Sequence, residues 1–187
     1  MDVTQRFIKI IRDRSNEHEA AMNLLVSFPS VMASILRQEL DSMVRVIYLL
    51  SIQSLDERNR LVAETLKGEV WTVITSNGKS KKITDREMVD AANQLHGWAL
   101  SVYKFGCAFI HLSNFHAYSD SNPFEMLCAD EQSYIINHLR HYHGGPSSDN
   151  PTFDELTEYF PRVFEKITGN LEFYLKDLES NKLDKVL

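Results

Sequence analysis

Three helix-start signals of one kind constrain this 187-residue chain more than any other feature of its sequence. Each is a capping box, in which a hydroxyl side chain caps a helix start and a glutamate three residues later bonds back to the backbone. The boxes run from Ser54 to Glu57, from Thr84 to Glu87 and from Thr152 to Glu155. Because apolar residues at helical spacing follow each box, we expect a helix after each one.

Helical periodicity extends over most of the remaining chain. We expect helices over residues 3–28, 31–51, 55–67, 85 to about 112–115, 129–142 and 153–178, the last with a bend or restart at residue 161. In the long helix after residue 84, Gly97 and Gly106 should allow close contact between helices rather than a kink. A charged row of Arg37, Asp41 and Arg45, one turn apart, should face solvent.

One segment departs from the helical pattern. It reads "EVWTVITSNGKSKKIT", in which β-branched residues flank Asn77-Gly78, a dipeptide that suits a type I′ turn. We expect a small β-hairpin around residues 69–83, with Trp71 packing it against the helices. The predicted fold is therefore an all-α bundle of five to six helices with a β-hairpin insertion, forming a single domain over residues 1–187.

Composition excludes several classes of protein. The formal net charge of -6 disfavours a general DNA-binding protein, although a local basic patch leaves RNA binding open. No apolar stretch reaches the roughly 18 residues of a membrane span, and the first residues do not resemble a signal peptide. Cys107 and Cys128 lie in apolar surroundings without CxxC spacing, so we expect core thiols and a cytoplasmic location.

The segment "NHLRHYH", residues 137–143, raises the question of a metal site. His138 and His141 share a helix face, but the acidic partner of a Glu-x-x-His motif is absent. His96 and His111 share a face of the long helix but would lie roughly 22 Å apart, at about 1.5 Å per residue. We therefore expect no metal and no cofactor. A histidine-rich metal-binding bundle is the alternative, and its ligands would come from His111, His116, His138, His141 and His143.

The order of long helices resembles the HEPN superfamily of small helical domains from bacterial toxins and phage-defence loci. The resemblance is carried by "VMASILRQELDSMVRVIYLLSIQSLDERNRLVAETL", which leads into further bundle helices, and it covers the helical part of the chain. Active HEPN proteins are metal-independent endoribonucleases, usually dimers. Their site pairs an arginine, often followed by a polar residue, with a histidine after about four to six intervening residues.

Two parts of the chain offer such a pair. Arg12 is followed by a polar residue and, after five intervening positions, by His18. Arg140 and His143 have only two residues between them, whereas Asn137 and His143 have the right separation but the wrong residue type. In such a pair, histidine transfers a proton to or from the ribose and arginine stabilises charge on the phosphate. These five residues are the candidate catalytic residues.

From the resemblance we expect a HEPN-like interaction or regulatory module of a bacterial defence or toxin system, without catalytic activity. Its partner would be another protein or a second copy of the chain in a homodimer. The alternative is a metal-independent endoribonuclease that uses Arg140 with His143 or Arg12 with His18.

Overall fold

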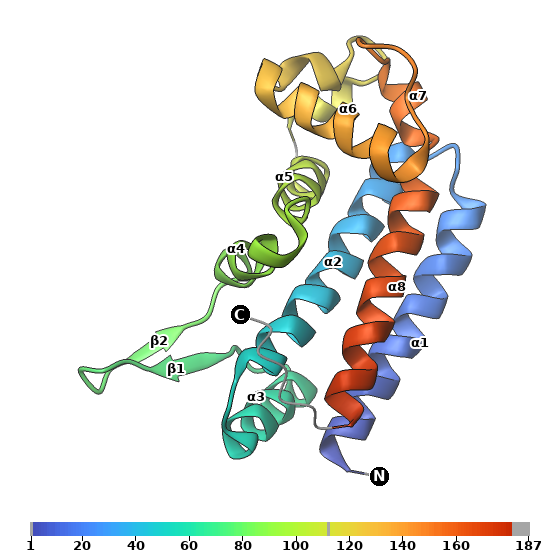
Figure 1. Cartoon of the computed structure of the whole chain (residues 1–187). Coiled ribbons are helices and arrows are strands. Elements are labelled where there is room, and N and C mark those ends of the chain that lie inside the picture. The colour runs from blue at the N-terminus through green and yellow to red at the C-terminus, as the bar shows by residue number, and fades with distance from the viewer. Residues whose placement is uncertain (1, 112, 181–187) are drawn as a thin grey trace.

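The computed structural model describes residues 2–111 and 113–180 of the chain. It is an all-α bundle with a small antiparallel β-hairpin, which confirms the predicted fold class (Figure 1). Its elements are α1 (Val3–Leu24), α2 (Pro29–Ser51), α3 (Leu55–Lys67), β1 (Thr72–Ile74), β2 (Ser80–Lys82), α4 (Asp85–His96), α5 (Ala99–Ile110), η1 (Asn114–Ala117), η2 (Pro123–Met126), α6 (Ala129–His143), α7 (Phe153–Thr157) and α8 (Phe160–Glu179). Within the described ranges, no helix combines the length and apolar character needed to cross a membrane.

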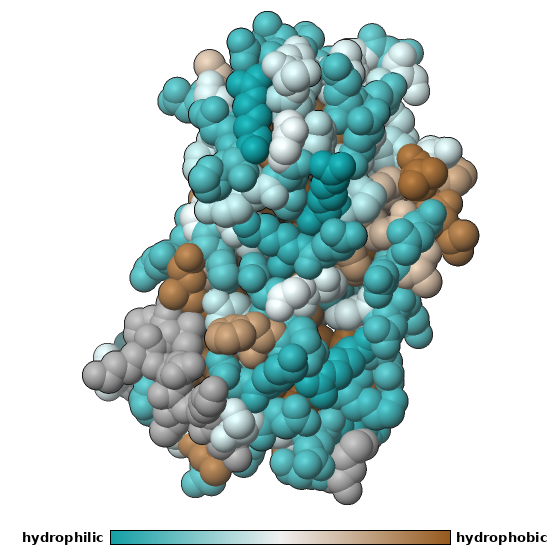
Figure 2. Space-filling model, turned by 45° about the vertical axis from the view of Figure 1, so that its right-hand side comes forward, coloured by the Kyte–Doolittle hydropathy of each residue, from teal (hydrophilic) through white to brown (hydrophobic). Residues whose placement is uncertain are grey.

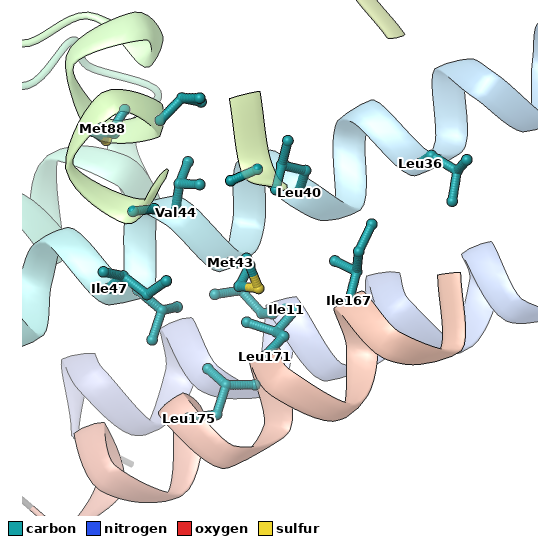
Figure 3. Close-up of a cluster of buried hydrophobic side chains, with 14 of the residues drawn as sticks. Ile11, Leu36, Leu40, Met43, Val44, Ile47, Met88, Ile167, Leu171 and Leu175 are labelled. Carbon is teal, nitrogen blue, oxygen red and sulfur yellow. The ribbon is translucent and has the colours of Figure 1, made fainter. Parts of the chain in front are cut away.

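Helix α2 is the centre of the bundle. It packs against α1 and α8 on one side and against α4 and α5 on the other (Figure 1). Figure 3 shows both contacts at one level of the helix: Met43 points toward Leu171 of α8, while Val44 points toward α4. A helix that is apolar on most of its circumference must be surrounded in this way, because no exposed face is left for polar residues.

A buried carboxylate links α2 to α1. The side chain of Glu39 is completely buried, and its two oxygens have separate partners on α1. Ser15 donates its hydroxyl proton to Oε1, and Nδ1 of His18 lies 2.6 Å from Oε2. Because a buried carboxylate without partners would be costly, these two contacts make Glu39 compatible with the core.

Arg37 was expected to face solvent, and that prediction is wrong. Its side chain is buried where α5 crosses α2, with the guanidinium carbon 4.3 Å from the ring centre of Tyr103. Its charge is balanced by Asp41 at 3.8 Å and Asp85 at 3.5 Å. The close crossing is made by Gly106 of α5, because a Cβ there would overlap the Cβ of Arg37.

The long helix expected after residue 84 is interrupted at Gly97. This residue has φ of +39°, a conformation that favours glycine, and it separates α4 from α5. The side chain of Asn93 stabilises the break, since its Oδ1 accepts a hydrogen bond from the backbone N–H of Leu100 at 3.0 Å. The expectation that Gly97 only allows close packing was therefore wrong, whereas Gly106 does have that role.

The predicted hairpin is present, but its turn differs from the expected one. Strand β1 pairs antiparallel with β2, with Val73 opposite Lys81. The carbonyl of Thr75 accepts from the N–H of Gly78 at 2.8 Å, so the glycine ends a four-residue turn instead of occupying its centre. With φ of +75° at Gly78, the loop is a longer hairpin connection and not a two-residue type I′ turn.

Most helix boundaries agree with the sequence, and the differences are local. Full capping boxes form at Thr84 and Thr152, while at Ser54 only the hydroxyl bond to the backbone N–H of Glu57 is seen. The first helix ends at residue 24 instead of 28. Trp71 is buried as expected, whereas Cys128, which was expected in the core, is exposed at the N-terminal end of α6.

We expect the substitution Gly106→Ala to destabilise the protein by about 1–3 kcal/mol, the usual cost of overpacking a core. The added methyl group would overlap Arg37, and the atoms in its way are close to the backbone and cannot easily move. Urea denaturation followed by circular dichroism would measure the change in the free energy of unfolding.

The matched control is Gly169→Ala in α8. A Cβ at this position has no neighbouring atom within 4 Å, so only the gain in helix propensity, up to about 1 kcal/mol, should remain. If the two variants were equally stable, the close crossing of α2 and α5 would not depend on Gly106.

Candidate functional site

Arg12 and His18, the predicted pair, both lie on α1, but their side chains contact two different neighbouring helices. The guanidinium of Arg12 donates to Glu172 of α8 from Nε at 3.0 Å and from Nη2 at 2.9 Å. His18 instead contacts the buried Glu39 of α2. The structure therefore gives each residue an acidic partner of its own and does not direct both at one open site.

Arg140 holds the loop that follows α6. Its Nε donates to the carbonyl of Pro146 at 2.7 Å, and its Nη2 reaches the carbonyl of Ser148 and the carboxylate of Asp149. The side chain of Asn137, on the same helix, is exposed and makes no hydrogen bond within the described residues. Of the catalytic candidates on α6, only His143 lines a pocket.

This pocket has a volume of about 80 Å³ and is lined by residues of α6 and of the bundle helices beside it. Helix α6 crosses the end of the bundle (Figure 1). Side chains from α2, α5, η2, α6, α7 and α8 form its wall. Most of the wall is apolar, including Leu36, Trp98, Phe105, Phe124, Leu139 and Phe160. Small-molecule sites commonly have this character, with apolar walls and a few convergent polar groups.

The polar groups of the pocket come mainly from α6. Tyr134 and His138 are one turn apart and stack with ring centres 6.4 Å apart. Tyr142, which does not line the pocket, lies 4.6 Å from the ring of His138. Trp98, immediately before α5, lies 6.2 Å from the ring of His138. Ser101 of α5 adds a hydroxyl group to the lining.

His143 is the most unusual of these groups. Its side chain is about nine-tenths buried, and Nε2 has no hydrogen-bond partner among the described residues. Buried polar atoms in folded proteins almost always have a partner, so this nitrogen is exceptional. The atom has almost no accessible surface, so it does not face the open space of the pocket.

A cation lies beside the histidines. The ammonium of Lys166 on α8 sits 3.2 Å from the ring centre of Tyr142, and burial lowers the pKa of this lysine. Burial lowers the pKa of His138 to about 4, with further contributions from the charges of Lys166, His143 and His141. The pKa of His143 is lowered by burial and then by Lys166 and Arg162. Both pocket histidines are therefore neutral at pH 7.

The histidines of the metal-binding alternative do not gather around one point. Among residues 2–111 and 113–180, no group of three histidine, cysteine, aspartate or glutamate side chains is arranged to hold a metal ion. His116 uses Nδ1 to accept from the backbone N–H of Ser113 at 3.4 Å, and His111 is exposed at the end of α5. His138 and His143 are close to each other but lack an acidic third ligand.

Sequence reasoning identified part of this pocket and missed the rest. It selected the histidine-rich end of α6, including His138 and His143. It missed Trp98 and Lys166, which lie far from α6 in the sequence. No local signal could have found them, because a lone tryptophan or lysine on a helix is ordinary.

Comparison of the chain with protein-family models, with curated proteins and with solved structures gives no significant match in any of the three.

We expect His138 to titrate at about pH 4 in the folded protein, and Lys166→Met to raise that pKa because it removes a nearby positive charge. Proton NMR of the histidine ring signals would measure both values. Lys176→Met is the matched control, since Lys176 lies on the same helix but pairs with Glu172. An unchanged His138 pKa in Lys166→Met would contradict this account of the electrostatics.

The lowered pKa of His138 also makes stability depend on pH. The unfolded histidine, with a pKa of 6.5, binds more protons than the folded one, so acid favours the unfolded state. The contribution of His138 to the free energy of unfolding is therefore complete above about pH 6.5 and is lost as the pH falls toward 4. Thermal melts should show a smaller acid destabilisation in His138→Gln than in the unaltered protein over that window.

Proposed function

We propose that the protein is a non-catalytic, HEPN-like interaction or regulatory module that binds a ligand in the pocket between α5, α6 and α8. The observation that carries this proposal is the pocket itself, an almost wholly apolar space of about 80 Å³ with His138 and His143 among its lining residues. An apolar ligand that fills such a space removes apolar surface from water, which favours binding. The resemblance to HEPN domains supplies the expected setting, a cytoplasmic bacterial defence or toxin system.

The contacts of the candidate arginines support a non-catalytic role. A ribonuclease would need Arg140 or Arg12 to be free for a phosphate group. Arg140 instead donates to three backbone carbonyls and one carboxylate, and Arg12 is held by Glu172 and Glu179. Catalysis would therefore require the loop after α6, or the contact between α1 and α8, to open first.

Exposed apolar side chains support a partner role. Leu24, Val26, Phe28 and Val31 are all exposed around the connection between α1 and α2, and Leu24 is 80% accessible. Figure 2 shows apolar surface gathered near its right-hand edge, beside this connection, on a face that is otherwise mostly hydrophilic. A second copy of the chain, as in the dimers of the HEPN superfamily, would bury this surface in our proposal.

We expect benzyl alcohol, a small neutral probe, to bind in the pocket with a dissociation constant on the order of millimolar, given its few atoms. The substitution Ser101→Trp should abolish binding because it fills the pocket from α5. Ser133→Trp is the matched control, since Ser133 is exposed on α6 outside the pocket. Two-dimensional NMR would map the affected backbone signals.

A thermal melt of each variant would show that it is folded. If benzyl alcohol perturbed no signals of residues around the pocket in the unaltered protein, or bound Ser101→Trp equally well, the proposal of a ligand pocket would be wrong.

The ribonuclease alternative has a separate test. We expect no cleavage when the purified protein is incubated with mixed cellular RNAs in EDTA, because the candidate arginines are engaged by protein groups. Gel electrophoresis would follow the RNA, alongside His18→Ala, His143→Ala and Arg140→Ala variants. Cleavage that disappears in one of the histidine variants would establish a metal-independent nuclease and identify its site.

A further inference from the structure

The β-hairpin projects from the helices, and its charged side chains share one sign (Figure 1). Residues 72–82 contain three lysines and no aspartate or glutamate, in a protein whose formal net charge is -6. All three residues of β2 are exposed, and so is Lys79 just before it. Lys81 pairs with Glu87, whereas Lys79 and Lys82 have no acidic partner within the described part of the chain. Strand β2 is therefore basic and open to solvent.

The register of the hairpin determines which backbone groups of β2 point outward. The N–H of Thr75 bonds to the carbonyl of Lys79 at 2.9 Å, so these two residues form a hydrogen-bonded pair. In an antiparallel ladder such pairs alternate with pairs that exchange no hydrogen bond. Ser80 and Lys82 belong to the second kind of pair. Their N–H and C=O groups therefore point away from β1.

The two edges of the hairpin differ in what already covers them. On β1, the carbonyl of Thr72 accepts a hydrogen bond from Nη2 of Arg60 on α3 at 2.6 Å. On β2, the outward backbone groups of Ser80 and Lys82 have no hydrogen-bond partner among the described residues. A strand edge with free donors and acceptors can pair with another extended chain. The β2 edge, residues 79–82, is thus where a further strand can be added.

We propose that the β2 edge binds an extended acidic peptide segment of a protein partner, which pairs with β2 as a third strand. The backbone of the peptide bonds to the outward N–H and C=O groups of Ser80 and Lys82. Because side chains alternate between the two faces of a strand, carboxylates of the peptide meet Lys82 on one face and Lys79 on the other. The β2 edge shares no residue with the pocket lining, so the inference goes beyond the ligand site proposed above.

Other partners match the β2 edge less well. In a second copy of the chain the same lysines would face each other, and like charges directly opposite one another destabilise a strand pair. A neutral strand would leave the lysines unpaired, and edge lysines commonly prevent such pairing. Single-stranded RNA binds through aromatic side chains that stack on its bases, and residues 72–82 contain none. An acidic peptide satisfies both the backbone groups and the charge.

The test titrates three capped hexapeptides into the full-length, isotope-labelled protein in low-salt buffer. Glutamate alternates with threonine in the first, lysine replaces glutamate in the second, and the third is the acidic peptide with all backbone amides N-methylated. Two-dimensional NMR would give each affinity and map the affected signals. We expect the acidic peptide to bind with a dissociation constant on the order of millimolar and to shift the signals of residues 79–83. The other two peptides should bind about tenfold more weakly.

Two variants separate charge from strand pairing. Lys82→Glu should weaken binding of the acidic peptide about fivefold, because it replaces an opposite-charge pair by a like-charge pair. Lys9→Glu is the control with the same change in charge, and it should leave the affinity unchanged, since Lys9 is exposed on α1, on the other side of α2 from the hairpin (Figure 1). Ser80→Pro should weaken binding without any change in charge, because proline lacks the outward N–H.

A thermal melt and the cross-strand NMR contacts would show that the hairpin of each variant is intact. The N-methylated peptide makes the same distinction as Ser80→Pro without altering the protein. Ser101→Trp, which fills the pocket, should leave peptide binding unchanged. Failure of the pocket and failure of the β2 edge are therefore separate results.

Four outcomes would overturn the inference. The first is that the acidic peptide does not bind. The second is equal binding of the lysine peptide, which would remove the role of charge. The third is equal binding of the N-methylated peptide, which would show ionic attraction without an added strand. The fourth is tighter binding of oligouridylate than of the acidic peptide at residues 79–83, which would make this edge a nucleic-acid surface.

Discussion

The burial of α2 on both sides is the constraint on which the rest of the structure depends. Fourteen residues of this helix are buried, so it needs neighbours around most of its circumference. Helices α1 and α8 cover one side, and α4 and α5 cover the other (Figure 1). Because the hydrophobic effect is proportional to the apolar area removed from water, this central helix accounts for a large share of the driving force for folding.

Such a central position also places polar residues of α2 in the core, and each shapes the packing around it. Glu39 requires Ser15 and His18 as partners and so fixes α1 against α2. Arg37 requires room and counter-charges, which Gly106 and the aspartates at positions 41 and 85 provide. The close crossing at Gly106 brings α5 near α2, and both helices then contribute to the wall of the pocket under α6.

Some charged side chains are used to hold the fold together, and others are left available for binding. Arg12 and Arg140 resemble catalytic candidates in the sequence, yet both are engaged by acidic or carbonyl oxygens. Lys166 attracts no attention in the sequence and is left without an acidic partner among the described residues, with its ammonium on the ring of Tyr142. A motif search favours residues by type and spacing, whereas binding requires groups whose hydrogen-bonding capacity is still free.

The sequence by itself determined where most helices begin, since capping residues and apolar periodicity act within a few turns of chain. It also determined the hairpin and the position of Trp71 in the core. Only the tertiary structure decided that Arg37 is buried, because its burial depends on Gly106, Tyr103 and Asp85, which are distant in the chain. The break at Gly97 is stabilised locally by Asn93, but the apolar periodicity continues across it and so did not reveal it. The pocket belongs to the same category. Its histidines lie on one helix, but its cation and its tryptophan come from other helices, and only the packing of those helices around α2 brings them together.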